Sequence, residues 1–127
     1  MSRWYEWVFA AVVLATPVWL FCVGPAVDSY CGARDGLADA QTDLAEGHLK
    51  LHIGGKWTPT SRAAAKIADE DYGIELINMG CIPTDYKTEY SRAYDEVVQR
   101  ELDRRSMNVS IETIWQVAEK TVDADPK

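Results

Sequence analysis

The sequence predicts a small α+β protein: a single N-terminal transmembrane helix, then a mostly helical domain with two short strands. Residues 8–27 contain no charged side chain. Polar and apolar residues alternate over 48–53, as in a half-buried strand, and 74–79 is a second strand candidate. The amphipathic segments with helical spacing are 37–46, 60–71, 84–105 and 110–122. We therefore expect a βαβ unit and two C-terminal helices after a membrane anchor.

The uncharged segment has the length of a membrane span. At 1.5 Å per residue, a helix over residues 8–27 is about 30 Å long, which matches the hydrocarbon core of a bilayer. Pro17 lacks a backbone N–H and predicts a kink, which membrane helices tolerate. Gly24-Pro25 is predicted to end the helix. The aromatic residues at its start, of the kind found at headgroup level, are Trp4, Tyr5 and Trp7.

Two other interpretations of this segment stay open. One is a signal peptide cleaved after Ala26, although the apolar stretch is long and Trp19 and Phe21 are bulky beside the cut. The other is a helix buried in the domain or in a partner, which about 100 further residues could hardly surround. For an uncleaved anchor, the positive charge before the span, from the α-amine and Arg3, slightly exceeds the positive charge after it, from Arg34. The domain of a single-pass protein is then expected on the extracytoplasmic side.

Residues 28–36 are rich in turn formers and predict a juncture after the anchor, 1–27. A small acidic domain is expected over 37–122, and its first, short helix ends at Gly47. The tail, 123–127, is expected to fray.

The order strand, helix, strand predicts parallel strands if the two are neighbours, because the connection is a compact helical crossover. Thr60 or Ser61 is the expected N-cap of that helix, and Tyr72-Gly73 is expected to close it. Thr84 is the expected cap of the longest helix, which runs to about Arg105.

Composition narrows the class of partner. The chain holds 13 Lys and Arg against 20 Asp and Glu, a net charge of −7. Nucleic acids need clusters of Lys and Arg to release their counterions, so nucleic-acid binding is not expected. The expected partners are the membrane, through residues 8–27, and a protein or a second copy of the chain.

Two cysteines outside the anchor could form a disulfide. In an oxidising compartment, Cys31 and Cys81 would close a loop of about 50 residues, which chain entropy credits with roughly 4 kcal/mol. The alternative is two free, mostly buried thiols. Cys81 is not predicted to be a nucleophile, because no recognisable motif places a histidine beside it.

His48 and His52 are weak metal candidates. Four residues apart on a helix, they would present both imidazoles to one metal, but on a strand they are separated by about 13 Å. They alternate with Leu49, Leu51 and Ile53, so both are expected on the solvated face of a strand. No metal and no other cofactor is therefore predicted.

A row of tyrosines at helical spacing, Tyr86, Tyr90 and Tyr94, is the strongest candidate for an interaction face. Such a row, with Trp115 expected nearby, is most often part of a core. The hydroxyl groups could instead line a groove for a partner protein.

Several short segments resemble a group of small uncharacterised bacterial proteins. These proteins share a D-L-A-x-G start, a Y-G-V-E-L strand, a G-C pair and a G-Y-N-x-V-M helix. The similar segments here are Asp43–Gly47, Leu49–Leu51, Tyr72–Leu76, Gly80-Cys81 and Ala93–Val97. The chain departs from the group at Ala93 and Asp95, where Gly and Asn are more usual. The resemblance covers roughly residues 42–118 and implies the order of elements, but no activity or ligand.

No catalytic residue is predicted. The sequence predicts a membrane-anchored accessory or protein-interaction domain of unknown specific role. The alternatives are a small exported protein released from its signal and a metal- or thiol-dependent enzyme that uses His48, His52, Cys81 or the acidic residues. The enzyme interpretation requires at least two of these groups within reach of one pocket.

Overall fold

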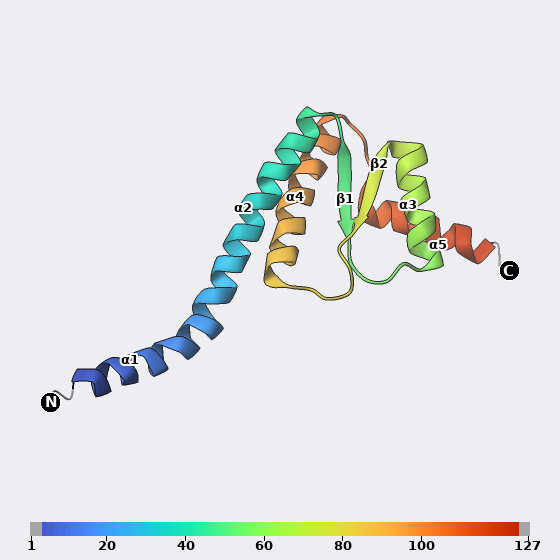
Figure 1. The fold of residues 1–127 in the computed structure, drawn as a ribbon. Helices are drawn as coiled ribbons and strands as arrows, with labels where there is room; N and C mark the ends of the chain where they lie inside the picture. The colour runs from blue at the N-terminus through green and yellow to red at the C-terminus, as the bar shows by residue number, and fades with distance from the viewer. Residues whose placement is uncertain (1–3, 125–127) are drawn as a thin grey trace.

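The structure is a computed structural model, and it describes residues 4–124. Figure 1 shows a long N-terminal helix that leads into a small domain in which helices flank a two-stranded sheet. The elements are helix α1 (Trp4–Val18), a π-helical turn η1 (Trp19–Val23), helix α2 (Gly24–Ala45), strand β1 (Leu49–Ile53), helix α3 (Pro59–Tyr72), strand β2 (Ile74–Asn78), helix α4 (Asp85–Arg104) and helix α5 (Ile111–Ala124). The predicted α+β class is confirmed, with its βαβ unit and two C-terminal helices.

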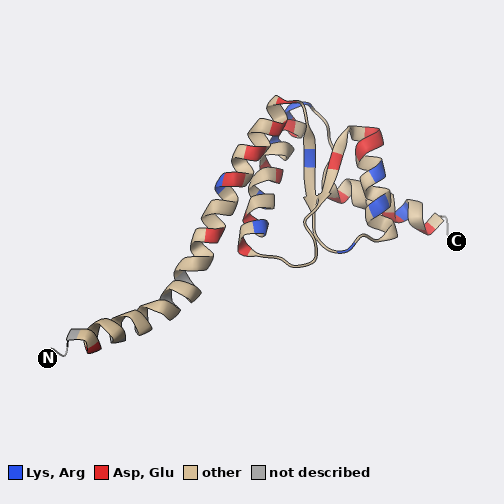
Figure 2. Cartoon of the chain, in the orientation of Figure 1, with Lys and Arg blue, Asp and Glu red and all other residues tan. Residues whose placement is uncertain are grey.

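Helices α1 and α2 form one continuous helix through the π-helical turn, and Figure 1 shows that its axis bends there. The turn lies between Pro17 and Pro25, and the missing N–H of Pro25 leaves the carbonyl of Phe21, within the turn, without its regular α-helical donor. Within the part of the chain that the structure describes, Tyr5–Ala45 is the one helix long and apolar enough to cross a membrane. The stretch between Glu6 and Asp28 carries no charge (Figure 2).

Helix α2 shows that the predicted juncture is wrong. Residues 28–36 are helical, and Gly24-Pro25 begins α2 instead of ending the anchor, because proline is tolerated in the first turn of a helix. The glycines that suggested turns are kept helical by close packing against α4. The short helix predicted over 37–46 is therefore the C-terminal end of a longer one. It stops before Gly47, which has a φ of 84°.

Strands β1 and β2 pair in parallel, as predicted, with Leu49 opposite Ile74. Helices α2 and α4 lie on one side of the sheet, and α3 and α5 lie on the other (Figure 1). Because side chains alternate along a strand, Lys50 and His52 of β1 point toward α2 and α4. The largest fully buried side chains of the core are Tyr94, Ile74, Leu102, Ile114 and Val98.

The helix ends follow local sequence signals. The N-cap of α3 is Thr58, whose hydroxyl accepts from the backbone N–H of Ser61, and not Thr60 or Ser61 as expected. Pro59 follows the cap, so the helix starts earlier than the apolar spacing indicated. Gly73 ends α3 in the left-handed conformation and Thr84 caps α4, both as predicted.

Helix α5 packs on α3 and completes the core. Its buried residues, Ile114 and Ala118, lie four positions apart on the predicted inner face. The helix predicted over 110–122 extends to Ala124, so the first two residues of the predicted frayed tail are helical. The rest of that tail, 125–127, lies outside the described residues.

Candidate functional site

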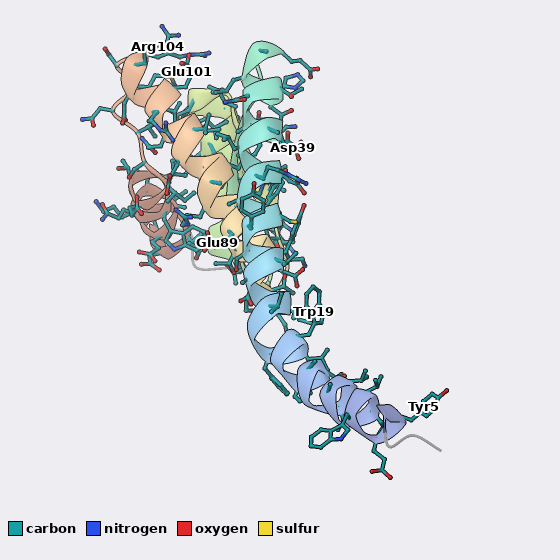
Figure 3. The ribbon with its side chains drawn as sticks, turned by 90° about the vertical axis from the view of Figure 1, so that its left-hand side faces the viewer. Tyr5, Trp19, Asp39, Glu89, Glu101 and Arg104 are labelled. Atoms are coloured by element: carbon teal, nitrogen blue, oxygen red, sulfur yellow. The ribbon has the colours of Figure 1, made fainter. Side chains whose placement is uncertain are left out.

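The three tyrosines of α4 face α2 and donate hydrogen bonds to three aspartates of that helix. The pairs are Tyr86–Asp35 at 3.1 Å, Tyr90–Asp39 at 2.8 Å and Tyr94–Asp43 at 2.5 Å, each across 51 positions. The separation of 51 positions stays the same while both partners advance along their helices by four residues. Helices α2 and α4 therefore run parallel and in register. Figure 3 shows the two helices side by side, with Asp39 on α2. We call these six residues the tyrosine–aspartate ladder.

The tyrosines of the ladder are the residues that the sequence analysis predicted as a possible interaction face. Tyr94 is 1% exposed and Tyr90 is half-buried, so the core interpretation fits these two residues better than an open groove. Tyr86, at 36%, is the exposed end of the row. The predicted face is therefore covered largely by α2 of the same chain.

Two glycines of α2 make this close contact possible. Gly32 lies against the backbone of Tyr86, and Gly36 lies against that of Tyr90. A Cβ at either glycine would overlap the facing carbonyl oxygen. Ala40, one turn further along, is fully buried. Small residues at every fourth position let the two helices approach more closely than larger side chains would allow.

Hydrogen-bond donors stabilise the negative charge of Asp43 in the ladder. The hydrogen bond from Tyr94 is the main cause that lowers the pKa of Asp43, and the bond from Lys50, at 3.0 Å, adds to it. Burial, together with the bond to Asp43, raises the pKa of Tyr94 far above its usual value. At both ends of the ladder, Tyr86–Asp35 and Tyr94–Asp43, a phenol with a raised pKa therefore donates to a carboxylate with a lowered pKa.

His52 is buried, so its predicted place on a solvated face is wrong. Helix α4 covers that face of β1, and the side chain is 6% exposed. Asp95 accepts from the backbone N–H of His52 at 3.1 Å and lies 2.8 Å from Nδ1. The carboxylate favours the tautomer with the proton on Nδ1. The rings of Tyr90 and Tyr94 meet the imidazole edge to face.

The second ring nitrogen of His52, Nε2, has no hydrogen-bond partner among the described residues. No buried side-chain nitrogen or oxygen in that part of the chain lacks a partner. Nε2 is therefore in contact with solvent, although most of the ring is enclosed. It is a free acceptor at the surface of a cavity.

His48 and His52 do not converge on one metal site. His48 lies before β1, 3.7 Å from Glu46, and groups with Asp43 and Glu46, whose ligand atoms lie within 4.8 Å of one another. Asp43 already accepts from Lys50 and Tyr94. A metal ion there would compete with the ammonium group of Lys50, so the geometry does not favour a metal centre.

A half-open cavity of about 320 Å³ lies where β1 and β2 end, and we call it the strand-end pocket. In Figure 1 both loops leave the sheet at the lower end of the two strands, and the loop after β2 leads to the start of α4. The loops are joined by the bond from the N–H of Gly55 to the oxygen of Gly80, at 2.9 Å. Both glycines have positive φ, which other residues rarely adopt. The pocket is lined by His52, Ile53, Gly54, Gly55, Met79, Gly80, Cys81, Ile82, Pro83, Lys87, Thr88 and Ser91.

The strand-end pocket brings together two groups that the sequence kept apart. Cys81 is exposed there as a free thiol, and His52 lines the same cavity. Cys31 is also a free thiol, half-buried on α2, so the structure does not form the disulfide that the sequence allowed. The carboxyl end of a parallel sheet is where α/β folds most often bind ligands.

No family model, curated protein or solved structure matches this chain. The similarity to the small bacterial proteins therefore stays a prediction, and the arrangement of residues must support any function. Sequence reasoning missed the role of Asp95, for which no local signal exists. It also missed the aspartates of the ladder, although Asp35, Asp39 and Asp43 repeat the four-residue spacing of the tyrosines.

Proposed function

We propose that the protein is a single-pass membrane protein that presents its βαβ domain at the membrane surface as an accessory or protein-interaction module. One observation supports this most: the uncharged helix continues without a break into α2, which is an integral part of the domain. Figure 3 shows Tyr5 and Trp19 extending outward from this helix, and they are 73% and 61% exposed. A row of exposed apolar side chains is stable in lipid and costly in water.

The continuous helix favours an uncleaved anchor over a signal peptide. Cleavage after Ala26 would have to occur within the first turns of α2, whereas proteases prefer exposed loop tips. The small excess of positive charge from the α-amine and Arg3 over Arg34 favours an extracytoplasmic domain.

Fractionation of the full chain with a C-terminal tag tests the anchor. We expect the protein in the membrane pellet after alkaline carbonate extraction, with an intact N-terminus by mass spectrometry. The double substitution Val12→Arg with Val13→Arg should release it, since each arginine costs about 2.5–3.5 kcal/mol at the centre of a span. Ala38→Arg with Gln41→Arg, on exposed positions of α2, is the matched control. A mature chain that starts at residue 27 would contradict the proposal.

Affinity capture from a detergent extract tests the accessory role. We expect a second protein, or a second copy of this chain, to be retained in a fixed ratio. Recovery of the tagged chain alone, as a monomer, would contradict an interaction module while leaving the anchor intact.

A thiol-dependent enzyme is the second candidate, because His52 and Cys81 line one pocket. With its proton held on Nδ1 by Asp95, His52 leaves Nε2 as a candidate base for a thiol. If His52 accepts the proton of Cys81, alkylation of Cys81 by iodoacetamide should be slower in His52→Gln, and the two proteins should differ in their pH profiles. Cys31 serves as the internal reference. Identical pH profiles in both proteins would exclude this candidate.

A further inference from the structure

The lining of the strand-end pocket differs in charge from the rest of the protein. The chain carries a net charge of −7, yet none of the described residues that line this pocket is acidic. Lys87 is its one permanently charged side chain, and His52 is its one other ionisable nitrogen base. Two other cavities among the described residues contain carboxylates, one Asp95 and Glu96 and the other Asp69 and Glu75. A negatively charged ligand therefore meets the least repulsion in this pocket.

Lys87 is the cation of the strand-end pocket. It belongs to the first turn of α4, the positive end of the helix dipole, where Asp85, which does not line the pocket, provides a negative charge. Its ammonium donates one hydrogen bond, to the carbonyl of Met79 at 3.2 Å, and keeps two further protons for other acceptors. The backbone N–H of Lys87 is bonded to the hydroxyl of Thr84, so the ammonium is the donor that this turn offers to an anion.

His52 provides an independent sign of a ligand. Its side chain is more than nine-tenths buried, and Asp95, which does not line the pocket, binds Nδ1. Nε2 is the nitrogen that remains for a ligand, and His52 lines both this pocket and the neighbouring cavity beside Asp95 and Glu96. In its protonated form the ring can donate to an anion in the pocket while still bonded to Asp95.

The rest of the lining is apolar and limits the size of the ligand. The apolar side is formed by Ile53, Met79, Ile82 and Pro83. A volume of about 320 Å³ corresponds to roughly ten groups of the size of a water molecule. We propose that the strand-end pocket binds a small organic anion, a carboxylate or phosphate monoester on a short apolar stem. The anionic group lies at Lys87 and His52, and the stem lies along the apolar side.

Protection of Cys81 from alkylation tests the proposal on the full chain. The protein, in detergent or in phosphatidylcholine nanodiscs, reacts with N-ethylmaleimide, and peptide mass spectrometry follows Cys81 and Cys31 separately. Hexyl phosphate, hexanoate, hexanol and hexylamine are the probes. We expect one or both anions to slow labelling of Cys81 saturably, about tenfold at ten times the Kd, with Cys31 unchanged. The detergent experiment does not depend on whether the helix spans a membrane.

The same measurement can refute the proposal. Equal protection by hexanol or hexylamine would show a merely apolar cavity, and no saturable protection by either anion up to about 10 mM would show no site. Nanodiscs that contain phosphatidic acid distinguish the source of the anion. Protection there without an added probe assigns it to a lipid headgroup, and protection by added anion alone assigns it to a soluble molecule.

Two variants locate the anionic group. Lys87→Gln and His52→Gln should each weaken protection by hexyl phosphate about tenfold or more, a typical loss for a charged hydrogen bond. Lys66→Gln and His48→Gln are the matched controls, because both residues are exposed and neither lines the pocket. Unchanged protection in Lys87→Gln would overturn the assignment. The comparison of charged and neutral probes uses the unaltered protein, so it remains decisive if a variant unfolds.

Discussion

Gly36 of α2 lies so close to Tyr90 of α4 that a Cβ at the glycine would overlap the tyrosine's carbonyl oxygen. The hydroxyl of Tyr90 reaches back to Asp39, less than one turn further along α2. Close backbone packing and side-chain hydrogen bonds therefore join the same parts of two helices. An N-terminal helix that is packed into the core in this way holds the domain at a fixed position relative to that helix, whereas a flexible linker would not.

Gly36→Ala should destabilise the full chain. Alanine gains up to about 1 kcal/mol in helix propensity, but overpacking against backbone typically costs 1–3 kcal/mol or more, so the net effect is a loss. Gly24→Ala is the control, because its Cβ would meet only an oxygen of Trp19 at 3.4 Å. Thermal unfolding in detergent, followed by circular dichroism, should show a lower Tm for the first variant alone. A Gly36→Ala variant as stable as the parent would show that α2 and α4 are less closely packed.

The three tyrosines of the ladder should differ in what their hydroxyls contribute. Tyr94→Phe removes a buried donor to a carboxylate and should cost about 1.5–3 kcal/mol. Tyr86→Phe removes a bond in contact with water and should cost less than about 0.5 kcal/mol. Tyr90→Phe should lie between them. Urea unfolding of the three variants measures this order, and equal losses would mean that burial does not set the strength of these bonds.

Asp43 should make the free energy of unfolding depend on pH in the acidic range. Its pKa in the folded protein lies below the ordinary value of 3.8, chiefly because Tyr94 donates to the carboxylate. The stabilisation is therefore complete above 3.8 and is lost as the pH falls through the folded pKa. In urea unfolding between pH 6 and pH 3, Asp43→Asn should lose less stability than the parent. Asp71→Asn, at an exposed position, should follow the parent, and parallel curves for all three would rule out this role.

The strand–helix–strand unit could be predicted because its signals are local. Period-two alternation marks β1, and the spacing of apolar residues marks the helix that follows it. Thr84 starts α4 by a hydrogen bond to a neighbouring N–H, and Gly73 ends α3 by its own backbone conformation. These features do not depend on the rest of the fold.

The helical path of 28–36 and the burial of His52 could not be predicted in this way. Gly32 and Gly36 favour turns in isolation, and only the surface of α4, more than 50 residues later, explains them as a packing face. The pattern around His52 shows which residues share a face, but not that α4 covers that face. The strand-end pocket likewise requires knowing that the two strands are neighbours. Each of these features depends on contacts between distant parts of the chain.

Asp95 allows a final test, because its carboxylate contacts both the backbone N–H and Nδ1 of His52. An asparagine oxygen can still accept from the backbone N–H and from Nδ1–H of His52, so Asp95→Asn should cost less than about 1 kcal/mol. Asp95→Ala leaves both donors without a partner and should cost about 1–3 kcal/mol. Unfolding free energies in detergent measure the difference, and NMR of the imidazole should find the proton on Nδ1 in the parent and in Asp95→Asn. Equal losses in the two variants would show that the negative charge of Asp95 matters more than its geometry as an acceptor.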